Sequence, residues 1–174
     1  DLVNPTFDVE GLAADPFNNK VYGIGDGNNL VVYDVAGNAW STVGNTGRNW
    51  DSAGLDYDPI DRVLYAVSPI QGNTLYRINP VTAAVTTVGP TGISGMGGGL
   101  AYVQTPLTYV SVTWSDNKIH LLDRNLIDLG GFVEGSGNPN GIATDGRVIY
   151  TGHFSPQLVI AHDYTVFNTK GEIV

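Results

Sequence analysis

The chain of 174 residues contains no cysteine, and this absence excludes disulfide bonds, thiolate metal sites and cysteine nucleophiles. Charged residues make up only 14% of the sequence and hydrophobic residues 42%, a balance that excludes a disordered or charge-rich helical protein. No apolar run approaches the length of a membrane span, so we expect no membrane insertion. The Gly-x-Ser-x-Gly, phosphate-loop and His-Glu-x-x-His patterns are also missing, which removes the commonest sequence signals of an enzyme.

Positive charge is scarce as well. Lysine and arginine together number 8 against 17 aspartates and glutamates, which gives a formal net charge of −9. Because proteins that bind nucleic acids neutralise phosphates with Lys and Arg, we expect no nucleic-acid partner. An acidic balance is compatible with solubility, with cation binding or with a basic partner.

Glycine, by contrast, is abundant at 23 residues, and a glycine opens a phrase that occurs four times. The phrase reads Gly-Leu-Ala-Ala-Asp at residues 11–15, and variants of it stand at 54–58, 99–103 and 141–145. Successive copies lie 42 to 45 residues apart. A period of about 40–45 residues with strand-like content is typical of the blades of a β-propeller.

Each copy of the phrase opens a series of short β-rich runs. In the first unit the runs are separated by Gly, Asn, Asp and Pro and cover residues 11–15, 20–24, 30–34 and 40–44. This pattern indicates strands joined by hairpins, and no segment has the sustained 3.6-residue apolar period of a helix. We therefore predict an all-β fold, namely a β-propeller with about four blades of four antiparallel strands each, or part of a larger propeller.

We predict a single β-propeller domain over residues 1–174, with approximate blades at 8–47, 51–92, 96–135 and 138–174. The third strand of the last blade is ambiguous, because both Val159–Asp163 and Thr165–Asn168 align with the earlier third strands. Under either alignment this blade is incomplete. Since folded proteins avoid unpaired strand edges, we expect either residues 1–7 or another chain to complete it.

Several segments carry a resemblance to known propellers. They are the Gly-Leu-x-x-Asp entry strand, residues 138–145, and the run at 75–80 followed by 85–89. These segments resemble blades of the YVTN, NHL and gluconolactonase-like propeller groups, over nearly the whole chain. The resemblance implies a fold rather than an activity, because propellers host many unrelated functions. It also implies that the loops entering the first strands share one face with the loops between second and third strands.

That face contains the candidate binding residues. They are polar or aromatic, as suits a ligand or peptide site, and comprise Trp50, Asp51, Trp114, Asp116, Asn140 and His153. Exposed aromatic side chains there stack on sugars or anchor protein partners, whereas packing within or between blades is the structural alternative for each tryptophan. A lone histidine can act as a general base, but the sequence offers it no nucleophile, so we assign no catalytic residue.

A calcium site is a further hypothesis. Gluconolactonase-like propellers hold calcium at the central axis through such entry loops, and the resemblance implies Glu10, Asp51 and Asn140 as ligands here. Calcium favours six to eight oxygen ligands that mix carboxylates and amide carbonyls. The structural alternative is that these groups cap strand ends and bind water. We therefore name calcium as the only candidate cofactor.

Other acidic residues have a structural interpretation. Aspartate or asparagine ends the third strands, at Asp34, Asn79 and Asp123, where it can bond to the backbone two residues on and nucleate a turn. A second acidic group lacks the glycine and distal glutamate of an EF-hand, so we interpret it as a hairpin turn; it comprises Asp56, Asp58 and Asp61.

We therefore expect a non-catalytic, secreted or cell-surface β-propeller that serves as a binding or structural module, including within a filament or other extracellular assembly. The scarcity of lysine and the many Thr, Asn and Gly residues favour an extracellular location. Its partner is expected to be a protein or another copy of the chain. Two alternatives remain open: a calcium-dependent, lactonase-like hydrolase, and a carbohydrate-binding propeller that uses Trp50 and Trp114.

Overall fold

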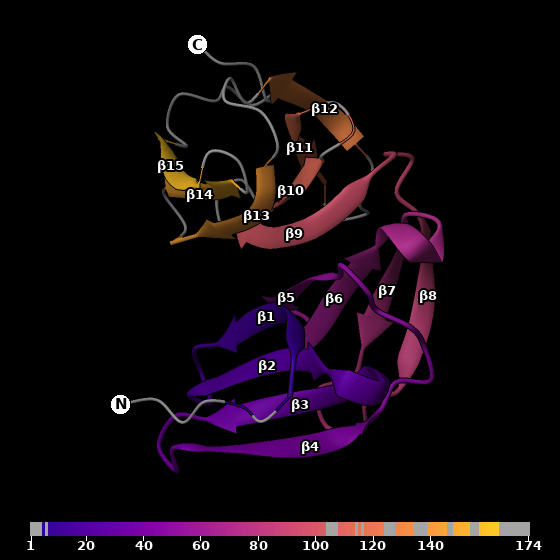
Figure 1. Ribbon diagram of the computed structural model, residues 1–174, viewed down its shortest axis with the longest axis vertical. Helices are drawn as coiled ribbons and strands as arrows, with labels where there is room; N and C mark the ends of the chain where they lie inside the picture. The colour runs from indigo at the N-terminus through magenta and orange to yellow at the C-terminus, as the bar shows by residue number, and fades with distance from the viewer. Residues whose placement is uncertain are drawn as a thin grey trace. The chain divides into compact units, whose positions relative to one another are not determined.

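The computed structural model describes residues 5, 7–103, 108–113, 115, 117–123, 128–133, 139–145, 148–153 and 157–163. The chain divides into two compact units, Asp1–Gly89 and Pro90–Val174. Each unit is built from two antiparallel sheets that run in simple up-and-down order (Figure 1). The units are described separately below.

The first unit contains two four-stranded sheets. The first sheet has the order β1-β2-β3-β4, with strands β1 (Val9–Asp15), β2 (Lys20–Gly25), β3 (Asn29–Asp34) and β4 (Ala39–Asn45). The second sheet has the order β5-β6-β7-β8, with strands β5 (Gly54–Asp58), β6 (Val63–Ser68), β7 (Thr74–Ile78) and β8 (Val85–Pro90).

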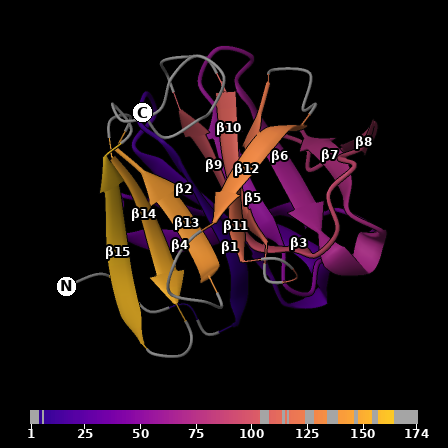
Figure 2. The same ribbon diagram turned by 90° about the horizontal axis from the view of Figure 1, so that it is seen from above.

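The second unit contains one four-stranded and one three-stranded sheet among the described residues. The former comprises β9 (Met96–Val103), β10 (Thr108–Thr113), β11 (Lys118–Leu122) and β12 (Asp128–Val133). The latter comprises β13 (Pro139–Thr144), β14 (Val148–His153) and β15 (Leu158–Asp163), which lie side by side in Figure 2. Of the two segments that the sequence left open for the third strand of this blade, the structure has Val159–Asp163, which lies in β15. Residues 164–174 lie outside the described part.

The fold-class prediction is confirmed: the protein is an all-β chain of four antiparallel β-propeller blades. In the described residues the helical structure is limited to two 3₁₀ turns, Asp26–Asn28 and Pro69–Gln71, which join the second and third strands of the first two blades. No helix within the described ranges is long and apolar enough to cross a membrane.

The aspartate that ends the repeated phrase closes the first hairpin of its blade. The Oδ1 atom of Asp58 accepts the backbone N–H groups of Ile60 and Asp61, at 2.7 and 3.1 Å. Asp15 makes the equivalent pair of bonds in the first blade. These are Asx turns, in which the side chain replaces backbone bonds that the turn cannot make. The prediction that Asp58 and Asp61 belong to a hairpin turn is therefore correct.

The glycine that opens the phrase allows two blades to approach closely. In the first unit β1 lies beside β5, and a Cβ on Gly11 would stand 2.9 Å from the Cβ of Leu55. In the second unit β9 lies beside β13, and a Cβ on Gly99 would stand 2.7 Å from Cγ2 and 2.8 Å from the backbone N of Ile142. Only a residue without a side chain fits at such distances.

Buried apolar side chains form a core in each unit. The first unit has a core that includes Ile24, Leu30, Leu55, Leu64 and Ile78. In the second unit Ile149 of β14 packs into a core with aliphatic side chains from β9, β10 and β11. Burial of this apolar surface supplies the main favourable free energy of folding.

Tyr57 connects the first hairpin turn to the core, and it gives the first unit an alkaline dependence of stability. Burial raises the pKa of Tyr57 above its ordinary value of 10.0, and the negative charge of Asp15, which also accepts its hydroxyl hydrogen bond, raises it further. The pKa of Tyr22, whose ring stacks on Tyr57, is raised by burial and then by Asp15.

The stability that these two tyrosines contribute is complete below pH 10 and is lost as the pH rises through their higher folded-state pKa values. We expect Tyr57→Phe to lower the free energy of unfolding at pH 8 by about 1 kcal/mol, because one hydrogen bond is lost. Above pH 10 the free energy of unfolding of the wild type is expected to fall towards that of the variant. Urea unfolding between pH 8 and 11 measures both curves, and parallel curves would contradict the assignment.

Candidate functional site

Loops from two blades enclose a small cavity in the first unit. Its volume is about 160 Å³, and its wall consists of Asp8, Glu10, Ile24, Gly25, Asp26, Gly27, Asn28, Asn49, Trp50 and Asp51. The structure thus brings together the entry loops of β1 and β5 and the loop between β2 and β3. Four of the lining side chains are carboxylates and none is a lysine or arginine, so the cavity has a strongly negative potential.

A network of asparagines fixes the loop between β2 and β3. The side-chain amide of Asn45 donates to the carbonyl of Gly27 at 2.6 Å and to Oδ1 of Asn29 at 3.1 Å. Asn29 in turn donates to the carbonyl of Asp26 at 3.0 Å. Gly27 and Asn28 have positive φ angles of 68° and 65°, a conformation that glycine and asparagine tolerate best. The loop backbone beside the Asp26 carboxylate is therefore held in one shape.

Trp50 forms the floor of this region rather than an exposed platform. It is only 1% exposed, and its indole Nε1 donates to Oγ1 of Thr46 at 2.6 Å. Its ring meets that of Tyr76 edge-on at 5.4 Å, and the Arg48 guanidinium lies 4.3 Å above the same Tyr76 ring. This burial leaves Trp50 little free surface on which a sugar could stack.

The two acidic residues of the calcium hypothesis both line the cavity, and both are exposed. Glu10 Oε2 accepts the backbone N–H of Ser52 at 3.1 Å, and the carbonyl of Asp51 accepts the Ser68 hydroxyl at 2.9 Å. Asn140 belongs to the other unit. Within the described part of the chain, no group of three or more His, Asp or Glu side chains is placed to hold a metal ion. The calcium ligands remain a prediction.

The second unit has its own open groove, of about 670 Å³. Two of the predicted binding residues, Asn140 and His153, line it together with Gly141, Gly152, Gln157, Leu158 and Val159. His153 ends β14 and is 7% exposed, whereas Asn140 is exposed at the start of β13. The other two predicted residues of this unit, Trp114 and Asp116, lie outside the described residues.

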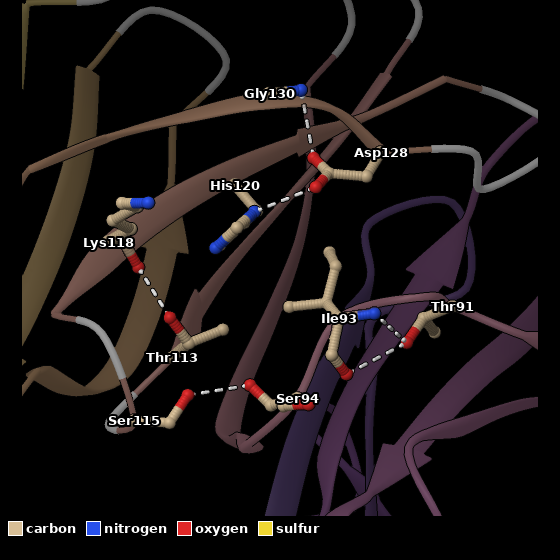
Figure 3. A network of polar contacts seen from close by, with 9 residues as sticks. All are labelled: Thr91, Ile93, Ser94, Thr113, Ser115, Lys118, His120, Asp128 and Gly130. Carbon is tan, nitrogen blue, oxygen red and sulfur yellow. Dashed lines mark hydrogen bonds and ion pairs between the residues drawn. The ribbon is translucent and has the colours of Figure 1, made fainter.

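A buried histidine and a carboxylate form a pair that sequence patterns did not reveal. His120 of β11 and Asp128 of β12 approach within 3.2 Å between Nδ1 and Oδ2, and Asp128 Oδ1 also accepts the N–H of Gly130 (Figure 3). The pairing depends on an irregular register between Leu121 and Leu122. His120 is buried at the strand position that Tyr76 occupies in the second blade, so we interpret this pair as structural.

The four antiparallel blades define the chain as a protein of the β-propeller class. No family model matches the sequence, and no curated protein matches it. Two solved structures have folds similar to that of this chain. The chain is similar to one in the crystal structure of a nidogen/laminin complex, with 15% sequence identity and a TM-score of 0.69 over 91% of this chain and 60% of that chain.

The second similar structure is a structural-genomics protein of unknown function from Bacteroides thetaiotaomicron VPI-5482. Sequence identity is 12% and the TM-score 0.70, over 89% of this chain and 47% of that chain. The present chain therefore spans less than two thirds of the length of either structure. At such low identities the likeness shows the fold alone.

Proposed function

We propose that this chain is a non-catalytic binding module, secreted or displayed at a cell surface, that recognises a protein partner through its blade loops. The acidic cavity of the first unit carries the proposal, because it is the site at which entry loops of two blades meet. The similar chain in the structure of a nidogen/laminin complex comes from an assembly of two proteins, which supports a protein partner.

The size and charge of the cavity favour one long basic side chain of the partner. A volume of about 160 Å³ lies well below the roughly 300–1,000 Å³ of typical small-molecule sites. A lysine or arginine inserted there would meet Asp26 and Asp51 at close range, and the net charge of −9 would steer a basic surface towards it. Docking of a side chain requires no catalytic group.

A peptide array tests this proposal directly. The untagged protein is expected to bind peptides that contain lysine or arginine and to ignore matched peptides in which glutamine replaces them. The double change Asp26→Asn with Asp51→Asn should weaken binding about fivefold, in the range measured for pairs of partly exposed charges. Raising the salt concentration should weaken it further, because exposed charges are screened.

Asp61→Asn is the matched control. It removes one carboxylate from a turn at the other end of the strands, and the equivalent turn of the first blade already carries Asn18 there. Binding by this variant should equal that of the wild type. Equal losses in the control and the double variant would contradict the cavity as the site.

Three further measurements on the same protein separate the alternatives. Calcium-dependent stabilisation that Glu10→Gln abolishes would instead support the lactonase-like hydrolase with Glu10, Asp51 and Asn140 as ligands. Binding to a glycan array would support the carbohydrate-binding alternative. Oligomers that form without any added peptide would support self-assembly, the second kind of protein partner expected from the sequence.

A further inference from the structure

The fourth blade brings two imidazoles to one hydroxyl group. Oγ1 of Thr151 lies 3.1 Å from Nε2 of His153 and 3.0 Å from Nε2 of His162. Thr151 is fully buried, His153 is nearly so, and His162 is half-buried. The two ring nitrogens therefore point to the same small volume inside the blade.

The strand register produces this convergence. Thr151 and His153 are two residues apart on β14, so their side chains lie on one face of the sheet. His162 of β15 pairs with Ile149, which lies on the same face of β14 two residues before Thr151. The histidine side chains thus approach the threonine from opposite directions along the strand.

The repeat itself shows that this arrangement is a departure from the other blades. The registers Leu64↔Ile78 and Tyr109↔Leu122 make Ile78 and Leu122 the counterparts of His162, and both are fully buried aliphatic side chains. By the same register, Ser68 and Thr113 take the place of His153. In the first blade the register Val21↔Tyr33 gives this position to a tyrosine, so the fourth blade is the one of the four that has an imidazole there.

We propose that His153 and His162 form a binding site for a divalent transition-metal ion of the zinc, nickel or copper class. Neutral imidazole is a preferred ligand of these ions, at about 2.0–2.1 Å from zinc. A cation held near Thr151 Oγ1 would accept one lone pair from each ring.

The open groove of the second unit gives such an ion a route from solvent. His153 lines both the groove and the histidine cluster, beside Asn140 and Gln157. No third His, Asp or Glu joins them among the described residues. With two protein ligands we expect an affinity in the micromolar range rather than the tighter binding of closed structural sites.

Isothermal titration of the untagged chain with zinc chloride and then with nickel chloride tests the proposal. We expect one equivalent of metal to bind at pH 7.5, and a chelator to reverse the binding. His153→Gln and His162→Ile should each weaken binding at least tenfold. His120→Gln, which changes the histidine held by Asp128, should bind metal as the wild type does.

The isoleucine variant keeps the test independent of misfolding. Because isoleucine is the residue of the second blade at this position, His162→Ile is expected to retain the wild-type circular dichroism spectrum and melting temperature while losing the metal. Absence of binding by the wild type at millimolar metal would overturn the proposal. Binding that survives both His153→Gln and His162→Ile, or that is lost equally in His120→Gln, would also overturn it.

Discussion

Gly99→Ala is expected to lower the free energy of unfolding by about 2–3 kcal/mol, the cost of forcing a methyl group into a packed region. The added Cβ would lie 2.8 Å from the backbone N of Ile142 and 3.1 Å from Cγ2 of Val112. A flexible side-chain end can move aside cheaply, but the backbone of β13 can move only by shifting the whole inner strand. The close contact between β9 and β13 would then be lost.

Gly141→Ala is the matched control, because Gly141 opens the same phrase in the fourth blade and a Cβ there would meet nothing within 4 Å. We expect no loss of stability, and a gain of up to about 1 kcal/mol from the reduced freedom of the unfolded chain. Urea unfolding followed by far-ultraviolet circular dichroism gives both values. Equal changes in the two variants would show that the blade contact does not determine the need for glycine.

Asp58→Ala is the second change with a large expected effect, a loss of about 2–4 kcal/mol for hydrogen bonds to a charged acceptor. Asp58 is 0% exposed, and its carboxylate holds the N–H groups of Ile60 and Asp61. Alanine would remove the carboxylate that accepts these two hydrogen bonds, so the turn would lose both of them. The melting temperature and the urea midpoint should both fall, without a change in the strand content of the native state.

Asp58→Asn separates hydrogen bonding from charge. Asparagine keeps an Oδ1 acceptor, and Asn79 already performs this task in the turn between β7 and β8, where it accepts the N–H groups of Val81 and Thr82 at 2.8 and 3.0 Å. We expect this variant to lose less than half as much stability as Asp58→Ala. Asp34→Ala, at an exposed turn with one such bond, should cost about 1 kcal/mol or less. Equal losses for the asparagine and alanine variants would contradict the role of the Asx turn.

The sequence predicted the strands well because their signal is local. Alternating apolar runs, glycines and turn-forming aspartates repeat in each unit, so the run at 20–24 appears as β2 and that at 30–34 lies in β3. The prediction for Asn79 also depended only on its neighbours, and its side chain does bond to the backbone two residues on. Such features need no knowledge of which strands pair.

Features that depend on side-chain direction and pairing were harder to predict. Trp50 stands in a loop of the expected binding face, yet it is buried, with its ring against Tyr76 and its indole N–H bonded to Thr46. The grouping of His153 with His162 required the register of β14 and β15, and the sequence left that strand ambiguous. The cavity that contains both Glu10 and Asp51 follows from loop positions shared by all blades, so the sequence could suggest their proximity but not a ligand.

The difference between the glycines of the repeated phrase also bears on how the sequence can evolve. Gly11 and Gly99 stand where a neighbouring inner strand leaves no space for a side chain, whereas Gly141 stands in open space. Purifying selection should therefore hold the first two fixed among descendants of this chain, while position 141 is free to drift to alanine or serine. The copies of one phrase would then diverge at different rates, and the repeat would fade first in its fourth copy.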